Sequence, residues 1–475
     1  MNEKNLVNRP LSRRQALKLM GGMAGMMALA ACAAPAAAPS GDAGGDAAPM
    51  EAAGSMVVVH RREYFKEMEE LFTEAVLAWG AANNVEIEVS PVAAEANEDF
   101  VAKLAAEVEA GNPPDLIYHR NSIVSQMYFL DLLTAVDDTA QQAMDAYGGT
   151  AAAQERFNVI DDQWWGVPYI MSGGTGAGVY ARRSWLEEAG VDPVAGIKTF
   201  DDLRDVALAI SDVEQERYGW GMTINRGGDA TGLIQAIIHN WGGQIVDADL
   251  TSITFNSQET VDAVAWLTEV FVSDQYADML APGILSWTDS SNNEAWLAGN
   301  IGLTKNAASV YAQGKADGNP IFEDTLVTEP IVGPYGEALT GGDGAQFNIP
   351  RGAGNPTQAA ELALHMLTPS VFLPISLISA GLFLPAYDDI YQMDEVVAAF
   401  EADPTLRRMG EMALGDYPGL SWPAQPNVLT DAVNAQSILP DLMAETVTAG
   451  VDPAEAVQRA TDRMNQIAEE LGAFS

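Results

Sequence analysis

The sequence predicts an α/β protein with a mainly parallel sheet and more than one core-bearing unit. The length supports more than one unit, because the chain has 475 residues and single cores stop growing at roughly 250–300 residues. The pattern supports the α/β class, because short β-branched runs alternate with stretches of helical spacing. Hydrophobic residues make up 48% of the chain, which is typical of globular proteins.

The alternation of strands and helices begins at residue 56. Residues 56–59 and 85–89 read as strands, the second with alternating apolar and charged residues. Helical spacing predicts helices over 65–77 and 100–108, and a third strand is expected at 115–118. In such sheets ligands bind beyond the carboxyl ends of the strands. The residues that follow the first and third strands are therefore candidates for a site.

The only cysteine, Cys32, stands at the end of a segment with the features of an export signal. Arg13 and Arg14 precede an apolar run over residues 20–31, which is shorter than the roughly 20 residues of a membrane-spanning helix. This pattern predicts an export signal over residues 1–31. The arginine pair resembles a twin-arginine signal, although Ala16 stands where a phenylalanine is usual, so the export route stays open.

The residues that end at Cys32, Leu-Ala-Ala-Cys, resemble a lipobox. In a lipobox the small residues admit the signal peptidase and the cysteine thiol takes a diacylglycerol. Residues 32–55 are rich in Ala, Pro, Gly and Asp without apolar periodicity, so we expect a flexible tether. The protein would then be anchored as a lipoprotein on the outer face of the cell membrane. An ordinary secretory signal with an incidental cysteine is the alternative.

The composition and the motifs exclude several classes of function. The chain has 66 Asp and Glu against 24 Lys and Arg, a net charge of −42, so its surface repels nucleic acid. Four histidines lie far apart without metal-ligand spacing, so no metal site is expected. The glycines at 173–178 lack the dinucleotide-binding pattern, and no G-x-S-x-G motif occurs. We expect no cofactor and no catalytic residue.

A series of phrases in the body resembles the extracellular solute-binding proteins, family 1, of ABC importers. The phrases keep the family's order along the chain and stand at residues 111–117, 165–169, 179–193, 199–203, 241–243, 296–300, 341–343, 349–352, 384–386 and 451–456. Ala181 and Arg182 depart from the family's usual Asn-Lys pair. No single phrase is specific, but the collinear series with a lipobox ahead of it is.

The resemblance implies a two-lobed fold of the periplasmic-binding-protein type II class, with the ligand in a cleft at the hinge. Lobe one would comprise residues 56–167 and 337–385, and lobe two residues 168–336 and 386–475. It also implies hinge closure, docking on the transmembrane subunits of an ABC permease, and a monomer. The expected function is that of a lipid-anchored receptor that binds a sugar or oligosaccharide without acting as an enzyme.

The candidate ligand-binding residues lie at the expected strand ends and hinge loops. Sugars present apolar faces and rings of hydroxyls, so their sites combine aromatic platforms with polar donors and acceptors. From lobe one the candidates are His60, Arg61, Glu63, His119, Arg120, Asn121 and Asp343. From lobe two or the hinge they are Tyr169, Asn225, Arg226, Trp241, Asn306 and Trp422. Stacking is expected of Trp241 and Trp422, and hydroxyl bonding of Arg61, Asn121, Asn306 and Asp343. Tryptophans are more often core residues than platforms, and His239 is expected to be structural.

Two other functions stay open at this point. The first is a receptor for a polyamine, a peptide or another cationic ligand, for which the acidic bias would matter. Arg61, Arg62 and Arg120 near the expected cleft argue against a cation and allow an acidic sugar. The second is a secreted glycoside hydrolase with two carboxylates about 5–10 Å apart. Consumption of an oligosaccharide would distinguish a hydrolase from a receptor.

Overall fold

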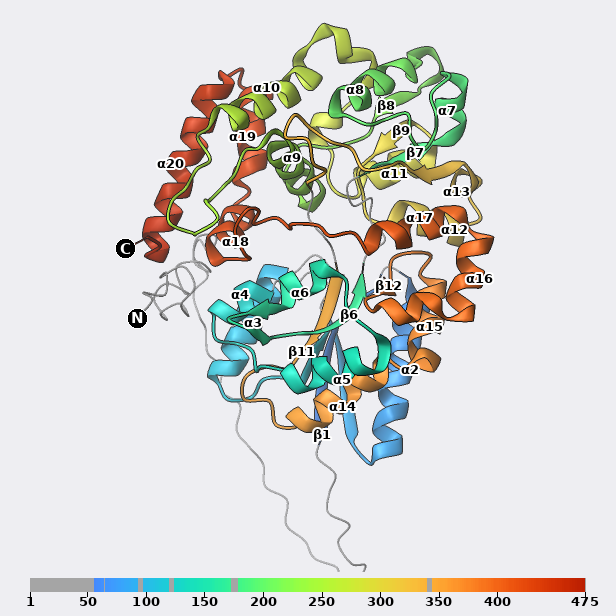
Figure 1. The fold of residues 1–475 in the computed structure, drawn as a ribbon, viewed down its shortest axis with the longest axis vertical. Coiled ribbons are helices and arrows are strands. Elements are labelled where there is room, and N and C mark those ends of the chain that lie inside the picture. The colour runs from blue at the N-terminus through green and yellow to red at the C-terminus, as the bar shows by residue number, and fades with distance from the viewer. Residues whose placement is uncertain are drawn as a thin grey trace, which may run out of the picture.

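The computed structural model describes residues 55–63, 65–92, 97–118, 124–171, 178–339 and 344–474. The expected export signal and Cys32 lie outside these ranges, and so do His119, Arg120, Asn121 and Asp343. The described chain forms two α/β lobes, drawn one above the other in Figure 1. The folded body begins at Ser55, the first residue of β1.

Lobe one contains a six-stranded sheet in the order β12-β6-β11-β3-β1-β2. Its strands are β1 (Ser55–Arg61), β2 (Glu86–Val92), β3 (Leu116–Tyr118), β6 (Val167–Met171), β11 (Gly344–Asn348) and β12 (Leu384–Pro385). β1 pairs in parallel with β2 and β3, whereas β11 is antiparallel to β3 and β6. The three strands expected in this part of the sequence are confirmed.

Helices cover both faces of this sheet. They are α2 (Lys66–Asn83), α3 (Asn97–Glu109), α4 (Val124–Phe129), α5 (Asp137–Tyr147), α6 (Ala152–Asn158), α14 (Pro356–Met366) and α15 (Pro369–Ile378), with a hairpin of β4 (Val159–Ile160) and β5 (Gln163–Trp164). Side chains alternate along β1, so Val58 packs with Phe72 of α2 while Val59 packs with Leu104 of α3. The expected helices over 65–77 and 100–108 are confirmed as α2 and α3.

Lobe two contains a four-stranded sheet in the order β10-β7-β9-β8. Its strands are β7 (Tyr180–Arg182), β8 (Tyr218–Trp220), β9 (Ile301–Thr304) and β10 (Thr325–Val327). Its helices are α7 (Arg183–Glu188), α8 (Phe200–Ala209), α9 (Gly228–Trp241), α10 (Gln258–Val272), α11 (Ser291–Ala298), α12 (Ser309–Ala316), α13 (Ile321–Asp324), α18 (Val428–Ala435), α19 (Ile438–Val447) and α20 (Pro453–Leu471). The short helical turns are η2 (Val213–Gln215), η3 (Asp274–Met279) and η4 (Ile284–Ser286).

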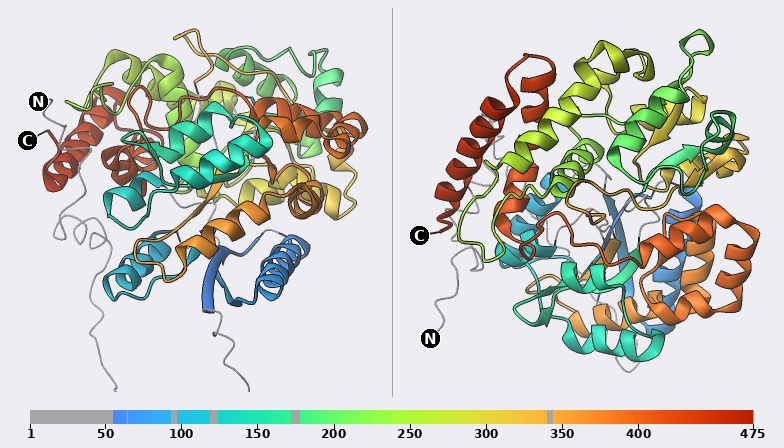
Figure 2. Two further views of the ribbon diagram at one scale, coloured as in Figure 1. Left: turned by 60° about the horizontal axis from the view of Figure 1, so that its bottom comes forward. Right: turned by 45° about the horizontal axis from the view of Figure 1, so that its top comes forward.

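The chain crosses between the lobes after β6, before β11 and after residue 402. β6 belongs to the lobe-one sheet, so this strand lies on the other side of the boundary expected at residue 167. After β12, η5 (Asp388–Gln392) and α16 (Asp394–Ala402) contact lobe-one elements, although residues from 386 on were assigned to lobe two. α17 (Pro404–Ala413) follows at the border of the two lobes, where Figure 1 labels it, and Figure 2 shows the orange-red helices of this part of the chain from two further sides.

Local sequence signals account for several helix ends. Thr199 and Asp202 form a capping box at the start of α8, where each side chain bonds the other's backbone N–H. Asp452 caps α20, Pro453 stands in its first turn, and Gly472 ends it in the left-handed region at φ 70°. Glycine adopts that region without steric cost, which explains the abrupt end of the helix.

Among the described residues, no single helix has both the length and the apolarity that crossing a membrane requires. α14 and α15, bent by 60° at the break between them, meet those two criteria only as a pair. Both helices supply buried residues to the main core of lobe one, including Leu362 and Phe372. Their apolar composition is therefore explained by core packing.

Candidate functional site

The carboxyl ends of the central strands of the two lobes face each other. β6 leads into the first crossing, so its carboxyl end faces lobe two. Because β11 is antiparallel to both β6 and β3, the parallel strands β1, β2 and β3 run in the same direction as β6. In lobe two, β7 begins after the crossing and is antiparallel to β9 and β10, while β8 is parallel to β9. The carboxyl ends of β8, β9 and β10 therefore face lobe one. We call these two sets of strand ends the facing edges.

At the facing edge of lobe one, His60 and Arg61 end β1 and Glu63 follows. His60 is 1% exposed, and its ring packs against Phe72 of α2 with ring centroids 5.0 Å apart. Its Nδ1 lies 2.7 Å from the carbonyl oxygen of Arg61. Burial lowers the pKa of His60, and the carbonyl contact only partly opposes this. His60 is therefore a neutral core residue, while Arg61 and Glu63 remain partly exposed at the edge.

Tyr169 lies in the middle of β6 and is fully buried. Its ring packs against Tyr118, Phe347 and Phe372, at centroid distances of 5.2, 4.6 and 5.4 Å. Burial and then the charge of Glu63 raise its pKa, so the hydroxyl stays protonated. Tyr169 is therefore a core residue of lobe one. It is not among the ligand contacts that we propose below.

At the facing edge of lobe two, Asn225 and Arg226 follow β8. The Asn225 N–H donates to Thr223 Oγ1 at 3.2 Å, and its side chain is partly exposed. Arg226 forms two parallel hydrogen bonds with Asp441 of α19, at 2.8 and 2.9 Å, with its side chain 67% exposed. An exposed pair contributes little stability. It does hold the guanidinium beside the edge in a defined orientation.

Asn306 follows β9 and is nearly buried. Its amide nitrogen donates to Asn293 Oδ1 at 2.6 Å, and its oxygen accepts from Ser309 Oγ at 3.3 Å. The amide thus connects the end of β9 to the first turns of α11 and α12. Both hydrogen bonds lie within lobe two, and ligand bonding by Asn306 remains a prediction.

Lys305, one residue earlier, and the start of α9 add groups that the sequence analysis did not select. The first N–H groups of α9, from Gly228 and Asp229, donate to the carboxylate of Asp289 at 2.8 and 3.2 Å. Asp229 in turn accepts from Asn292 Nδ2 at 2.8 Å. Burial lowers the pKa of Lys305 to about 8, against the opposing charge of Asp229. Lys305 directly follows the apolar strand β9, so its position at a strand end could have identified it from the sequence. Asp289 comes from a loop with no such signal.

A glycine makes the contact between Asp289 and α9 possible. A Cβ on Gly227, directly before α9, would lie 2.3 Å from Asp289 Oδ1. Real Cβ atoms do not approach that closely, so any side chain there would displace the carboxylate. The Gly227–Gly228 pair in the sequence therefore has a packing reason at this edge.

The two tryptophans expected to stack on a sugar lie in different surroundings. Trp241 packs among aromatic rings of lobe two, 5.5 Å from Phe200 and 5.3 Å from Trp266 between centroids. Trp422 lies in the crossing segment after α17, with its ring 5.4 Å from His239 and 5.3 Å from Tyr335. Trp422 is partly buried, whereas Tyr335 is 49% exposed. Both tryptophans are partly buried, so the difference lies in their partners. Trp241 packs against rings within lobe two, whereas Trp422, in the crossing segment, stands beside the exposed ring of Tyr335.

His239, expected to be structural, is 1% exposed on α9. Burial lowers its pKa to about 3, so it is neutral at physiological pH. Its ring packs against the ring of Trp422. The described residues contain no group of three His, Cys, Asp or Glu side chains that could hold a metal ion.

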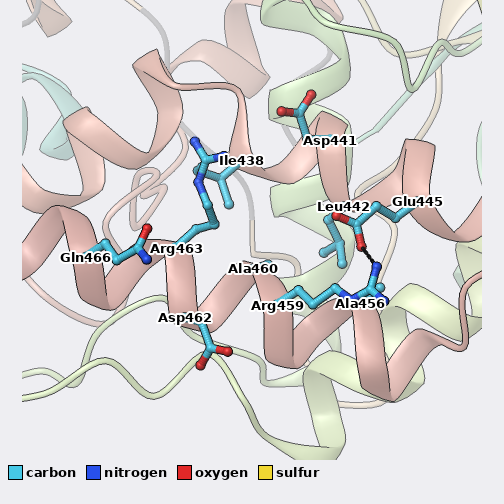
Figure 3. A pocket seen from close by; sticks show the side chains of 10 residues that line it. All are labelled: Ile438, Asp441, Leu442, Glu445, Ala456, Arg459, Ala460, Asp462, Arg463 and Gln466. Carbon is cyan, nitrogen blue, oxygen red and sulfur yellow. Dashed lines mark hydrogen bonds and ion pairs between the residues drawn. The ribbon is translucent and has the colours of Figure 1, made fainter. Parts of the chain in front are cut away.

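Two surface hollows lie beside these elements. One, with a volume of ≈510 Å³, lies between α6 and β4 of lobe one and the crossing segment at Gln425 and Pro426. The other, ≈340 Å³, lies between α19 and α20 (Figure 3). In it the Arg459 side chain reaches Glu445 at 3.2 Å, and Asp441, the partner of Arg226, also lines it. The first hollow is thus lined by lobe one and the crossing segment, and the second by lobe two alone.

Two α/β lobes with several crossings, and with polar strand ends that face each other, define the class of proteins that bind a small solute between lobes. The sequence match agrees with this class. Residues 72–407 match the family model described as bacterial extracellular solute-binding protein, and the chain belongs to that family. It is therefore an extracytoplasmic binding protein by family, and no curated protein matches the chain.

Solved structures of sugar-binding proteins share this fold. Maltose-bound MalE3 of T. maritima matches with a TM-score of 0.70 and 15% identity, over 87% of this chain and 100% of that one. A solute-binding protein of Thermotoga lettingae TMO with bound α-D-tagatose matches with a TM-score of 0.68 and 16% identity, over 87% and 99%. A sugar transporter of Arthrobacter chlorophenolicus A6 with bound laminaribiose matches with a TM-score of 0.69 and 14% identity, over 87% and 99%. The expectation of a two-lobed periplasmic-binding-protein fold is confirmed.

Proposed function

We propose that this protein is the receptor of an ABC importer and binds a sugar or oligosaccharide between its facing edges. The observation that carries the proposal is that the strand ends of the two lobes that face each other carry polar side chains. Arg61 and Glu63 come from lobe one, and Asn225 and Lys305 from lobe two. Maltose, tagatose and laminaribiose occupy structures of the same fold, which supports this class of ligand.

The chemistry of these groups suits a sugar. Guanidinium, carboxylate and amide groups donate to and accept from hydroxyls, and their charge strengthens those hydrogen bonds. Trp422 and Tyr335 offer an apolar surface of the kind that packs against the C–H face of a sugar ring. His119, Arg120, Asn121 and Asp343 were predicted at the same edge, and we keep them in the proposed site. A receptor for an acidic sugar, a polyamine or a peptide is the second candidate.

Binding without turnover distinguishes a receptor from a hydrolase. The family consists of binding proteins, which supports a receptor. We therefore propose that the protein returns its ligand unchanged. We also propose that Cys32 carries a diacylglycerol, that residues 32–54 tether the body to the membrane, and that the monomeric protein delivers its ligand to the permease. A tether raises the concentration of receptor near the permease.

A thermal-shift screen tests the proposal. Maltose, laminaribiose, tagatose, glucuronate, spermidine and a peptide mixture are each added, and the sugars are quantified before and after. A ligand at 100 times its Kd stabilises the folded state by about 2.7 kcal/mol, which is readily visible in the Tm. We expect a shift with a neutral sugar and full recovery of that sugar. A shift with spermidine or peptide alone would replace the ligand class, and loss of the sugar would indicate a hydrolase.

A further inference from the structure

Two contacts between the lobes lie at opposite sides of Figure 1, one at α17 and the other where α4 meets α18. On one side the core is continuous, because Met409 and Met412 of α17 join buried residues of lobe one to Tyr180 and Val327 of lobe two. Thr405 Oγ1 also donates to a carbonyl of β10 at 2.9 Å. Separating the lobes there would expose a packed core. We infer that this side stays closed when the lobes move and that it acts as the pivot.

On the other side, lobe-one α4 meets lobe-two α18. Ser125 Oγ of α4 donates to Asp431 Oδ2 of α18 at 2.6 Å. Phe129, also in α4, is buried among residues of the lobe-two core. This contact is made by one short helix from each side, whereas at α17 a buried core extends through both lobes. Rotation about the α17 side would separate α4 from α18.

Asp431 is partly buried where α18 packs against α4, α19 and α20. Burial raises its pKa to about 7, although the hydrogen bond from Ser125 acts in the opposite direction. α4 contains no charged residue, and the hydroxyl of its Tyr128 donates to Asp161. The ionisable groups on the two other helices packed against α18 have other partners or are exposed: Asp441, Glu445, Glu455, Arg459, Asp462, Arg463, Glu469 and Glu470.

We propose that the Ser125–Asp431 contact is a proton-linked clasp that forms when the lobes close and breaks when they open. The two residues would not touch the ligand, so they are positioning residues for its capture. This inference rests on the proposed function only in that closure captures the solute. No part of it depends on which solute is captured.

The sign of the pH effect follows from the burial of Asp431. In the closed form the carboxyl is shielded and holds its proton up to about pH 7, whereas in the open form it is hydrated and returns toward its ordinary pKa of 3.8. The closed form therefore binds the proton more tightly, and acid favours closure. Between pH 8 and pH 5 the ratio of closed to open molecules rises by up to roughly 90-fold.

The lobe separation can be measured directly with a pair of spin labels. In the full chain with Cys32→Ser, labels are placed through Leu77→Cys on α2 and Val272→Cys on α10, which are 45% and 53% exposed. The distance distribution is recorded at pH 8 and pH 5, without ligand and with maltose or laminaribiose. We expect the short-distance fraction to increase at pH 5 even without sugar.

Variants separate a clasp from a structural contact. Asp431→Asn keeps an oxygen acceptor for Ser125 and is always neutral, so we expect a large closed fraction at both pH values. Ser125→Ala removes the donor, so the closed fraction falls at pH 8, but the response to acid persists. Asp262→Asn, an exposed carboxylate of α10, is the matched control and should leave the pH response unchanged.

Distances that do not change between pH 8 and pH 5 would overturn the clasp, and so would an unchanged pH response in D431N. If D431N fails to fold, S125A decides the question, because an unchanged closed fraction of S125A at pH 8 would overturn the clasp. If the sugars leave the distances unchanged while acid still closes the lobes, the clasp stands and the proposed ligand class fails. If sugars bind and close the lobes equally at both pH values, the proposed function stands and the clasp is wrong.

Discussion

Removal of the Asp403 carboxylate is the sharpest test of how the lobes are held together at α17. Asp403 caps α17, accepting from the Leu406 N–H at 2.9 Å. Its two oxygens also accept from the Tyr311 hydroxyl at 2.8 and 2.7 Å, and from Lys315 Nζ at 2.6 Å. α17 contacts both lobes, so loss of this carboxylate weakens the side that we identify as the pivot.

The expected cost of Asp403→Ala is the sum of three contributions. Loss of the helix cap costs about 1 kcal/mol. The Tyr311 hydroxyl, on a ring that is 3% exposed, loses its partner at a cost of about 1–3 kcal/mol. The Lys315 pair is partly exposed and adds less than about 1 kcal/mol. We expect the free energy of unfolding to fall by about 2–5 kcal/mol, and by about 1 kcal/mol for Asp403→Asn, which keeps the acceptor oxygen.

The pH dependence gives a second readout for the same variant. Burial acts to raise the pKa of Asp403, but the bonds from Lys315, Leu406 N–H and Tyr311 outweigh it and hold the pKa below its ordinary value of 3.8. The lowered pKa means that the carboxylate stabilises the fold above pH 3.8 and that this stability is lost as the pH falls through the native pKa. The difference between the parent chain and Asp403→Asn should therefore shrink below pH 3.8.

Urea unfolding followed by tryptophan fluorescence measures both effects. Asp394→Ala is the matched control, because this exposed residue stands in the first turn of α16 and its side chain has no partner among the described residues. We expect the control to stay within about 0.5 kcal/mol of the parent. A loss below about 1 kcal/mol in Asp403→Ala, or a loss equal to that of the control, would refute the reasoning.

Two further predictions concern the ligand and the anchor. Trp422→Ala should weaken the affinity for the sugar found in the screen by roughly 10-fold or more. Trp241→Ala should lower the stability by about 2–3 kcal/mol and leave the affinity unchanged. Calorimetry measures the affinities and urea unfolding the stabilities, and equal affinity losses in the two variants would contradict the assignment. Cys32→Ser should release the protein from the membrane fraction, and mass spectrometry of the parent N-terminus should find the diacylglycerol; an unmodified cysteine would indicate an ordinary secretory signal.

The sequence predicted the fold well where the signal was local. The alternation at 85–89 and the turn before residue 115 identified β2 and β3 because side-chain period and turn residues are properties of the neighbouring chain. The lobe boundaries were less predictable. β6 pairs with β11, which is far away in sequence, so its place in the lobe-one sheet follows from strand pairing that no local pattern reports.

The candidate site was predictable by position but not by orientation. The rule that ligands bind beyond the carboxyl ends of strands identified Arg61, Glu63 and Asn225, and the topology brings these residues to the facing edges. The same rule selected His60 and Asn306, whose side chains are nearly buried and bonded within their own lobe. Whether a residue at a strand end faces inward or outward depends on side-chain alternation and on neighbours from other segments. Sequence alone does not supply those neighbours.

The start of α9 connects the local structure to the choice of ligand. A helix N-terminus attracts anions, and at the lobe-two edge the Asp289 carboxylate already fills that place with two hydrogen bonds. An anionic solute at the start of α9 would meet a like charge, so this helix end favours a neutral sugar over a uronate. We expect a larger thermal shift with glucose than with glucuronate, and a smaller difference in Asp289→Ala, which frees the N–H groups. Asp289→Asn keeps an acceptor and removes the charge, so it separates repulsion from loss of the cap. A larger shift with glucuronate in the parent chain would contradict the argument and return the acidic sugar to first place.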